Sequence, residues 1–266
     1  MDSVFPPLTA TGFDAITSAL PAVVYLLVAL AAVLYAPRDT RTRVFLLVAV
    51  TNLAPYALPF YAWRRPGSTF TRPLLSVIAV SLLLGSLALF HFTQVFPWRR
   101  PWIRRYFELL LTGYLLGPFI VLGLIWFAPA TPEEMQAAYA VLTLFIGLPT
   151  VFAVGVVAPF AGLLSLYYSY LAARAAGLDR ARVPLAGIIV SQLAGGVLAI
   201  LVIPLLHFVA PSGPWVAIAS ALLAAFGVVM PLAFAAGIWT FGVLTLDIDD
   251  LPSIRPALQG PIEPPS

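Results

Sequence analysis

Residues 215–239 read WVAIASALLAAFGVVMPLAFAAGIW, a run of 25 residues without a charged side chain. A helix needs about 20 mostly apolar residues to cross the roughly 30 Å hydrocarbon core of a bilayer. The stretch therefore predicts a membrane-spanning helix. The whole chain shares its character, because 61% of the 266 residues are hydrophobic and only 9% are charged. A soluble domain carries about 25% charged residues, so the composition indicates an integral membrane protein.

Six more apolar stretches precede this one, and together they predict an all-α, polytopic bundle of seven transmembrane helices. We expect the spans at about 14–36, 44–62, 73–96, 107–128, 137–173, 184–209 and 215–245. The chain is thereby divided into an extracellular N-terminus at 1–13, a membrane domain at 14–250 and a proline-rich cytoplasmic tail at 251–266.

The fifth stretch is longer than a bilayer requires. A helix that starts at Thr131-Pro132 and runs to Gly177 would be roughly 68 Å long, at 1.5 Å per residue. Pro149 and Pro159 are expected to bend or divide it. We therefore predict a separate external or interfacial helix at 132–147 and a span at about 149–173.

The arginines predict the orientation. All 14 basic residues are arginine, and eleven of them fall in the loops after odd-numbered spans or in the tail. The other side carries only Arg64, Arg65 and Arg72. Cytoplasmic loops are enriched in basic residues, so we expect the N-terminus outside and the C-terminus inside. The arginine-only, alanine-rich and proline-rich composition favours a bacterial cytoplasmic (inner) membrane.

Several kinds of chemistry are excluded by residues that the sequence lacks. It has no cysteine, so disulfides and thiolate metal sites are ruled out. It has no lysine, so Schiff-base chemistry and the P-loop are ruled out as well. No hydrolase or metalloprotease motif occurs. We therefore expect a non-enzymatic protein with no cofactor, no metal and no nucleic-acid partner.

Polar and aromatic residues of the predicted outer half are candidates for binding a ligand. They are Tyr25, Asn52, Tyr56, Tyr61 and His207. A mostly apolar cavity with a few such groups suits a lipid-like or aromatic molecule. The alternative is that the aromatic residues and the histidine form an interfacial belt and that Asn52 makes an interhelical hydrogen bond.

Two histidines and a stripe of small residues complete the candidates. His91 and His207 are expected near opposite membrane faces, so they cannot share a metal or haem. Gly187, Ser191 and Gly195 lie four residues apart. Small residues at this spacing let helices approach closely, either within the bundle or across a homodimer.

Two segments resemble signatures of a known module. His91-Phe92-Thr93-Gln94-Val95-Phe96-Pro97 is similar to a His-Phe-x-x-x-Phe-Pro signature, and Leu246-Asp247-Ile248-Asp249 is similar to a Leu-Phe-Asp-Ile-Asp signature. Both occur in the seven-span N-terminal sensor region of bacterial sensor histidine kinases. The resemblance covers about 14–250 and implies a sensory membrane module. The family continues into an output domain, whereas Asp250 is followed here by the proline-rich tail.

The first functional expectation is therefore a non-enzymatic sensor or adaptor that signals through a separate cytoplasmic or membrane protein. An accessory subunit of a bacterial membrane complex is the second. A small-molecule transporter is the third, although the spans offer few polar groups to line a path. Besides a protein partner, the surrounding bilayer, a lipid-like or aromatic ligand and a second copy of the chain are expected partners.

Overall fold

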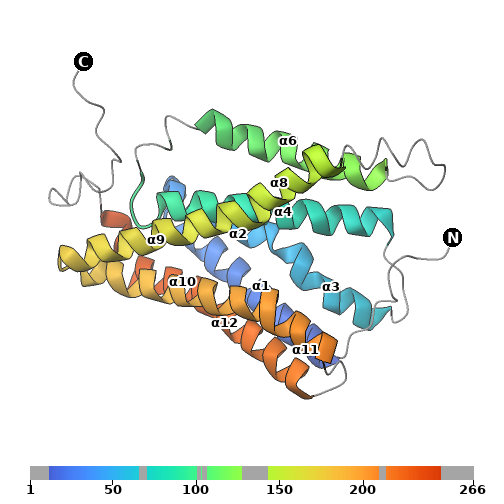
Figure 1. The fold of residues 1–266 in the computed structure, drawn as a ribbon. Helices are drawn as coiled ribbons and strands as arrows, with labels where there is room; N and C mark the ends of the chain where they lie inside the picture. Colours follow the sequence, from blue (N-terminus) through green and yellow to red (C-terminus); the bar gives the residue numbers. More distant parts are fainter. Residues whose placement is uncertain are drawn as a thin grey trace.

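The computed structural model describes residues 12–65, 71–100, 103, 107–127, 143–209 and 214–246, and all secondary structure in these residues is helical (Figure 1). The main helices are α1 (Gly12–Tyr35), α2 (Thr40–Thr51), α3 (Leu53–Arg64), α4 (Arg72–Val95), α6 (Phe107–Trp126), α9 (Ala158–Ala175), α10 (Asp179–Val197) and α12 (Pro214–Trp239).

Five described helical stretches are long and apolar enough to cross a membrane. They are Ala15–Tyr35, Thr40–Arg64, Arg72–Val95, Thr143–Ala175 and Ala217–Trp239. The prediction of an all-α protein is thereby confirmed for the described residues, and these five helices are compatible with the predicted membrane protein. Leu110–Trp126 is a shorter apolar helix. Residues 1–11 and 247–266 lie outside the described residues, and they include most of the predicted N-terminus (1–13) and the whole predicted tail (251–266).

The helices form a ring with one helix at its edge. α1 packs against α2, α3 and α12, while α4 packs against α2, α3 and α9. α9 continues the ring to α10, and α10 closes it on α12. α6 packs on the other side of α4 (Figure 1). α4 therefore makes most of the described contacts between the ring and α6.

The second predicted span is interrupted at Asn52. This residue ends α2 and precedes α3, and its Nδ2 donates a hydrogen bond to the Val48 carbonyl at 2.7 Å. Pro55, three residues later, has no N–H to continue the helical hydrogen bonding. A Cβ at Gly85 of α4 would lie 3.5 Å from Thr51 Oγ1, so the interruption packs closely on α4.

Three prolines follow wide π-helical turns. The π-helical segments are η1 (Thr143–Gly147), η2 (Ala153–Val157) and η3 (Leu198–Val202), and they lead into α8 (Leu148–Phe152), α9 and α11 (Ile203–Val209). Pro149, Pro159 and Pro204 each occupy the second residue of the helix that follows. A wider turn leaves room for a residue that has no N–H and whose ring would clash with the preceding turn.

These turns correct one detail of the prediction for the fifth span. Pro149 does not divide the chain into helices at 132–147 and 149–173, because the helix runs without a break from Thr143 to Ala175. The π turns accommodate the prolines, so no loop is needed. Residues 128–142 lie outside the described part of the chain.

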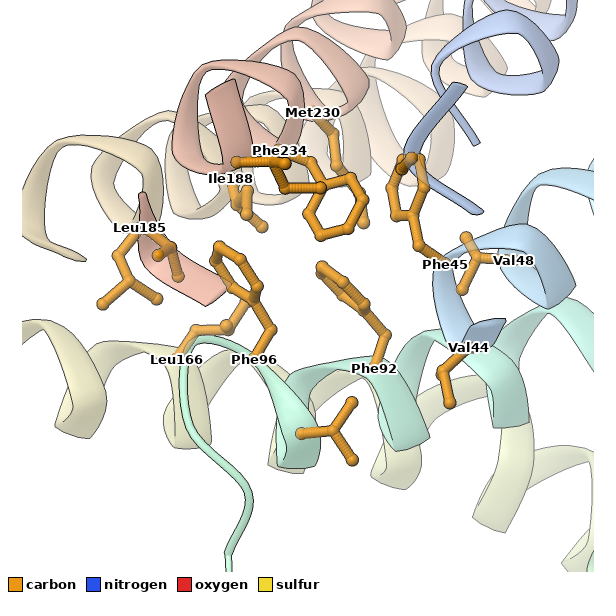
Figure 2. Close-up of a cluster of buried hydrophobic side chains, with 14 of the residues drawn as sticks. Val44, Phe45, Val48, Phe92, Phe96, Leu166, Leu185, Ile188, Met230 and Phe234 are labelled. Atoms are coloured by element: carbon orange, nitrogen blue, oxygen red, sulfur yellow. The ribbon is translucent and has the colours of Figure 1, made fainter. Parts of the chain in front are cut away.

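A cluster of buried aromatic rings lies where α4 and α12 end. Phe234 of α12 stacks on Phe45 of α2, with ring centroids 4.0 Å apart. It also makes edge-to-face contacts with Phe92 of α4 and with Phe96 just after α4, with ring centroids 5.4 and 5.5 Å apart (Figure 2). All four rings are less than 2% exposed. We call this region, with residues 36–42, 96–100 and 240–246, the Arg41 end of the bundle.

The small-residue stripe of α10 packs against α12 of the same chain. Ser191 Oγ donates a hydrogen bond to the Phe226 carbonyl at 2.6 Å. A Cβ at Gly187 would lie only 2.8 Å from the Cβ of Ala233. The stripe therefore allows a close approach of two helices within the bundle.

This contact predicts opposite results for two glycine substitutions in α10. Gly187→Ala should lower the unfolding temperature, because Ala233 has no flexible side chain that could move away; the overpacking costs about 1–3 kcal/mol. Gly196→Ala adds the same methyl group where nothing lies within 4 Å, and should gain up to about 1 kcal/mol of helix propensity. Thermal unfolding in mild detergent measures both. Equal effects would contradict the close α10–α12 contact.

Candidate functional site

The turn between α1 and α2 is held by two capping side chains. Asp39 is the N-cap of α2, and its Oδ1 accepts a hydrogen bond from the Arg41 N–H at 2.7 Å. Thr42 Oγ1 hydrogen-bonds to the carbonyls of Ala36 and Asp39 at 2.8 and 2.9 Å. A carboxylate at the N-cap satisfies backbone donors that the helix leaves free. The turn therefore fixes Arg41 in the first turn of α2.

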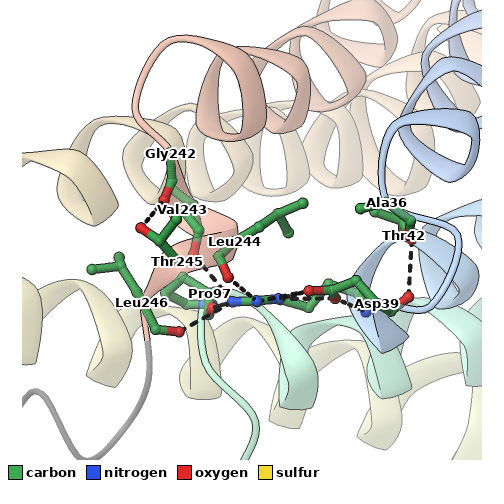
Figure 3. A network of polar contacts seen from close by, with 10 residues as sticks. Ala36, Asp39, Thr42, Pro97, Gly242, Val243, Leu244, Thr245 and Leu246 are labelled. Atoms are coloured by element: carbon green, nitrogen blue, oxygen red, sulfur yellow. Dashed lines mark hydrogen bonds and ion pairs between the residues drawn. The ribbon is translucent and has the colours of Figure 1, made fainter.

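The Arg41 guanidinium joins this turn to two distant segments of the chain (Figure 3). Nη1 donates to the Pro97 carbonyl at 2.6 Å, in the loop after α4. The other backbone acceptors are carbonyls after α12, in and beside the short helix η4 (Val243–Thr245): Val243 at 3.1 Å, Leu244 at 2.6 Å and Leu246 at 3.3 Å. One side chain thus ties together the ends of α1, α4 and α12.

Asp39 balances the charge of Arg41. Arg41 Nη2 lies 2.8 Å from Asp39 Oδ2, and the two side chains are 12% and 21% exposed. Burial raises the pKa of the Asp39 carboxyl, but the hydrogen bonds and the positive charge of Arg41 outweigh it and hold the pKa below its usual value. We call Arg41, Asp39 and the four carbonyl groups the Arg41 cluster. With its donors engaged inside the chain, Arg41 is suited to joining segments rather than to binding a substrate anion.

A second polar cluster ties the end of α4 to α9. Ser165 Oγ donates to Gln94 Oε1 at 3.0 Å, and Gln94 Nε2 donates to Thr93 Oγ1 at 2.9 Å. Arg100 Nη2 donates to the Ser165 carbonyl at 2.7 Å and to Ser169 Oγ at 3.0 Å. Burial lowers the pKa of the Arg100 guanidinium from its usual value. The loop after α4 is therefore anchored on both sides, by Arg41 and by Arg100.

The His91–Pro97 segment supplies residues to the aromatic core and to both polar clusters. Phe92 and Phe96 belong to the aromatic core, and the Phe96-Pro97 peptide bond is cis. His91 is half-buried, and its ring lies 6.3 Å from that of Tyr114 in α6. Of the Leu246–Asp249 segment, Leu246 is described and accepts from Arg41, whereas Asp247 and the residues after it lie outside the described part of the chain.

The predicted ligand residues are found in different places. Tyr25 is buried, its hydroxyl lies 3.1 Å from the Met230 sulfur, and its ring stacks on Phe45. The Tyr56 hydroxyl reaches α12 as well, where it would lie 3.3 Å from a Cβ at Gly227. The structure therefore brings Tyr25 and Tyr56 against the same helix.

The remaining three ligand candidates do not join this pair. Asn52 caps α2 and faces α4. Tyr61 lines an apolar groove of about 420 Å³ between α2–α3 and α4, and neither Tyr25, Asn52 nor Tyr56 lines that groove. His207 lies in α11, but its side chain is outside the described part of the structure.

Sequence reasoning missed the special position of Arg41. In the sequence, Arg41 is one of several basic residues in a predicted cytoplasmic loop. Its position in the first turn of a helix could be predicted, because Asp39 precedes it at the spacing of a helix N-cap. Its carbonyl partners could not be predicted, because they lie 56 to 205 residues away in the chain and backbone carbonyls carry no sequence signal.

The lowered pKa of Asp39 predicts a pH dependence at the Arg41 end. Because the folded pKa lies below the usual value of 3.8, the carboxylate stabilises the fold fully above that value, and the stabilisation is lost as the pH falls through the folded pKa. Asp39→Asn keeps the N-cap but removes the charge, and should cost about 1 kcal/mol at pH 7. Unfolding curves between pH 3 and pH 7 measure this. If wild type and variant lose stability in parallel on acidification, Asp39 is not the responsible group.

Comparison with protein-family models, with curated proteins and with solved structures gives no match for this chain. The contacts of the Arg41 cluster and the groove beside Tyr61 are then the features from which a function can be inferred.

Proposed function

We propose that the chain is a non-enzymatic membrane sensor or adaptor, which passes a rearrangement of its helices to a separate protein at the Arg41 end. The observation that carries this proposal is the contact of one guanidinium with the ends of three helices. A shift of α1, α4 or α12 must either move these carbonyl groups together or break their hydrogen bonds to Arg41. Residues 243–246, whose carbonyls Arg41 holds, would follow that shift and present it to a partner.

The proposed topology has seven spans, with the N-terminus outside and the C-terminus in the bacterial cytoplasm. Besides the five long apolar helices, α6 and the continuous helix from Asp179 to Val209 would be the remaining spans. At 1.5 Å per residue the latter is roughly 46 Å long, enough to cross the bilayer. The Arg41 end would then carry the arginine-rich loops on the cytoplasmic side, in keeping with the positive-inside rule.

The resemblance to the sensor region of histidine kinases supports the same function. Pro97 belongs to the first resembling segment and Leu246 to the second, and Arg41 donates hydrogen bonds to both carbonyls. The π turns η1 and η2 precede α9, and η3 lies between α10 and α11, so all three lie away from the Arg41 end of the bundle, where α9 ends and α10 begins. Such turns and prolines are common sites of bending. A ligand or lipid that binds there better in one packing would bias the bundle toward it.

The topology can be tested directly because the chain has no cysteine. Single cysteines at residues 133 and 262 should react with a membrane-impermeant maleimide from opposite sides. In intact cells, 133 should be labelled and 262 should not. Labelling of 262 alone would reverse the proposed orientation.

The sensor mechanism can be tested with spin labels at the Arg41 end. Arg99 and Thr240 are exposed and follow α4 and α12, so one label at each reports the distance between the two helix ends. We expect two distances whose proportions change with lipid composition. A reference pair at Tyr168 and Val183, exposed on α9 and α10, should give one unchanged distance. A single distance at both pairs, with a stoichiometric complex that survives mild detergent, would instead indicate an accessory subunit.

A further inference from the structure

An apolar groove runs along α3, on the side that faces α4. It has a volume of about 420 Å³ and is lined by residues of α2, α3 and α4. Its lining includes Val50 of α2, Leu53, Ala57 and Tyr61 of α3, and Ile78 of α4. The volume is within the range of about 300–1,000 Å³ that is typical of ligand pockets.

The lining of the groove suits a hydrocarbon chain, because its residues are all aliphatic apart from Tyr61. They belong to Thr40–Arg64 and Arg72–Val95, two of the stretches that are long and apolar enough to cross a membrane. In a bilayer the groove would therefore lie at the depth of the hydrocarbon core, where a lipid acyl chain can occupy it.

A positive charge lies beside Tyr61, one of the residues that line this groove. Arg65 follows α3, and its guanidinium carbon lies 5.8 Å from the centroid of the Tyr61 ring. Arg65 is exposed and makes no ion pair with any residue that the structure describes. Arg64 turns to another face of α3, where it lies over Phe60 and Trp63 at 5.7 and 5.2 Å. Neither of those rings lines the groove.

We infer that this groove binds an anionic phospholipid of the adjacent leaflet, with one acyl chain along α3 and the phosphate on Arg65. A guanidinium presents paired N–H groups that match phosphate oxygens. An uncharged lipid would fill the groove but leave the arginine without an anion. The site does not depend on the proposed sensor function, because a transporter or a structural subunit with the same groove would bind the same lipid.

The test measures lipid binding to the purified chain by native mass spectrometry. The probes are phosphatidylglycerol, phosphatidylcholine and diacylglycerol with the same acyl chains, and inorganic phosphate. Wild type should retain phosphatidylglycerol about fivefold better than phosphatidylcholine, which is the usual contribution of one basic residue near an anionic membrane. Diacylglycerol should bind still more weakly, and inorganic phosphate alone should not be retained.

Matched variants separate the charge from the groove. Arg65→Gln should abolish the fivefold preference, whereas Arg64→Gln, which removes the same charge one residue away, should keep most of it. Ala57→Phe fills the groove and should reduce binding of all three lipids. Ala225→Phe, at an exposed alanine of α12, should leave it unchanged.

Three lipid-binding results would overturn the inference. They are equal retention of the two phospholipids by wild type, equal losses in Arg65→Gln and Arg64→Gln, and unchanged binding in a folded Ala57→Phe variant. Arg65 is exposed, so its substitution should leave the fold intact. If Ala57→Phe does not fold, the comparison of the two arginine variants still tests whether Arg65 binds the phosphate. Retention of inorganic phosphate without lipid would also count against a lipid site.

Discussion

Arg41→Met is expected to destabilise the chain by about 3–5 kcal/mol and to release the segment that follows α12. Methionine keeps much of the length of the side chain but donates no hydrogen bond. Four carbonyl groups would lose a donor at once, those of Pro97, Val243, Leu244 and Leu246. Asp39 would become a largely buried carboxylate without its cation, and breaking one partner of such a pair typically costs 3–5 kcal/mol.

The loss can be measured in two ways. The unfolding temperature reports the stability, and a cysteine at Val243, which is fully buried, reports local opening through its rate of maleimide labelling. We expect labelling to be at least about tenfold faster in the Arg41→Met background, which corresponds to about 1.4 kcal/mol of local stability. Arg43→Met is the matched control, because Arg43 is exposed and donates to one carbonyl, that of Pro37. Similar labelling in both backgrounds would mean that Arg41 does not hold this segment.

The part of the Arg41 cluster that lies close together in sequence was open to prediction, and the rest was not. Asp39 at the start of an apolar run is the pattern of a helix N-cap. The pairing of this turn with the loop after α4 depends on how the helices pack, which a hydropathy pattern does not specify. Nothing in the sequence links the two resembling segments, whereas in the structure a single side chain contacts both of them.

The helices themselves were predictable because apolar length is a strong signal in a membrane. The interruptions and π turns within these helices were harder to predict. Pro149 and Pro159 were expected to bend or divide the fifth span, but a proline alone does not reveal whether the chain forms a loop or a π turn. Asn52 was a candidate ligand residue, and the structure shows its amide bonded to the Val48 carbonyl at the end of α2. In both cases the outcome depends on how backbone hydrogen bonds are satisfied locally.

The second large effect is expected from Phe234→Ala. Phe234 is completely buried and contacts the rings of Phe45, Phe92 and Phe96. In water such a truncation costs about 3–5 kcal/mol. In a bilayer the transfer part of this cost falls, because the lipid around separated helices is as apolar as the core, while the lost packing contacts remain. We therefore expect about 2–4 kcal/mol from unfolding measured in lipid nanodiscs or bicelles.

Phe119→Ala provides the matched control for the packing contribution. Phe119 of α6 is 72% exposed on the side of the bundle, so its removal should change the stability by less than about 1 kcal/mol. The double variant Phe96→Ala/Phe234→Ala should cost less than the sum of its single variants, since the two rings contact each other and the second truncation enlarges an existing cavity. Strict additivity would mean that α4 and α12 are not coupled through these rings. Coupling, in contrast, would connect the aromatic core to the carbonyl groups that Arg41 holds just beyond it, because Phe96 directly precedes Pro97.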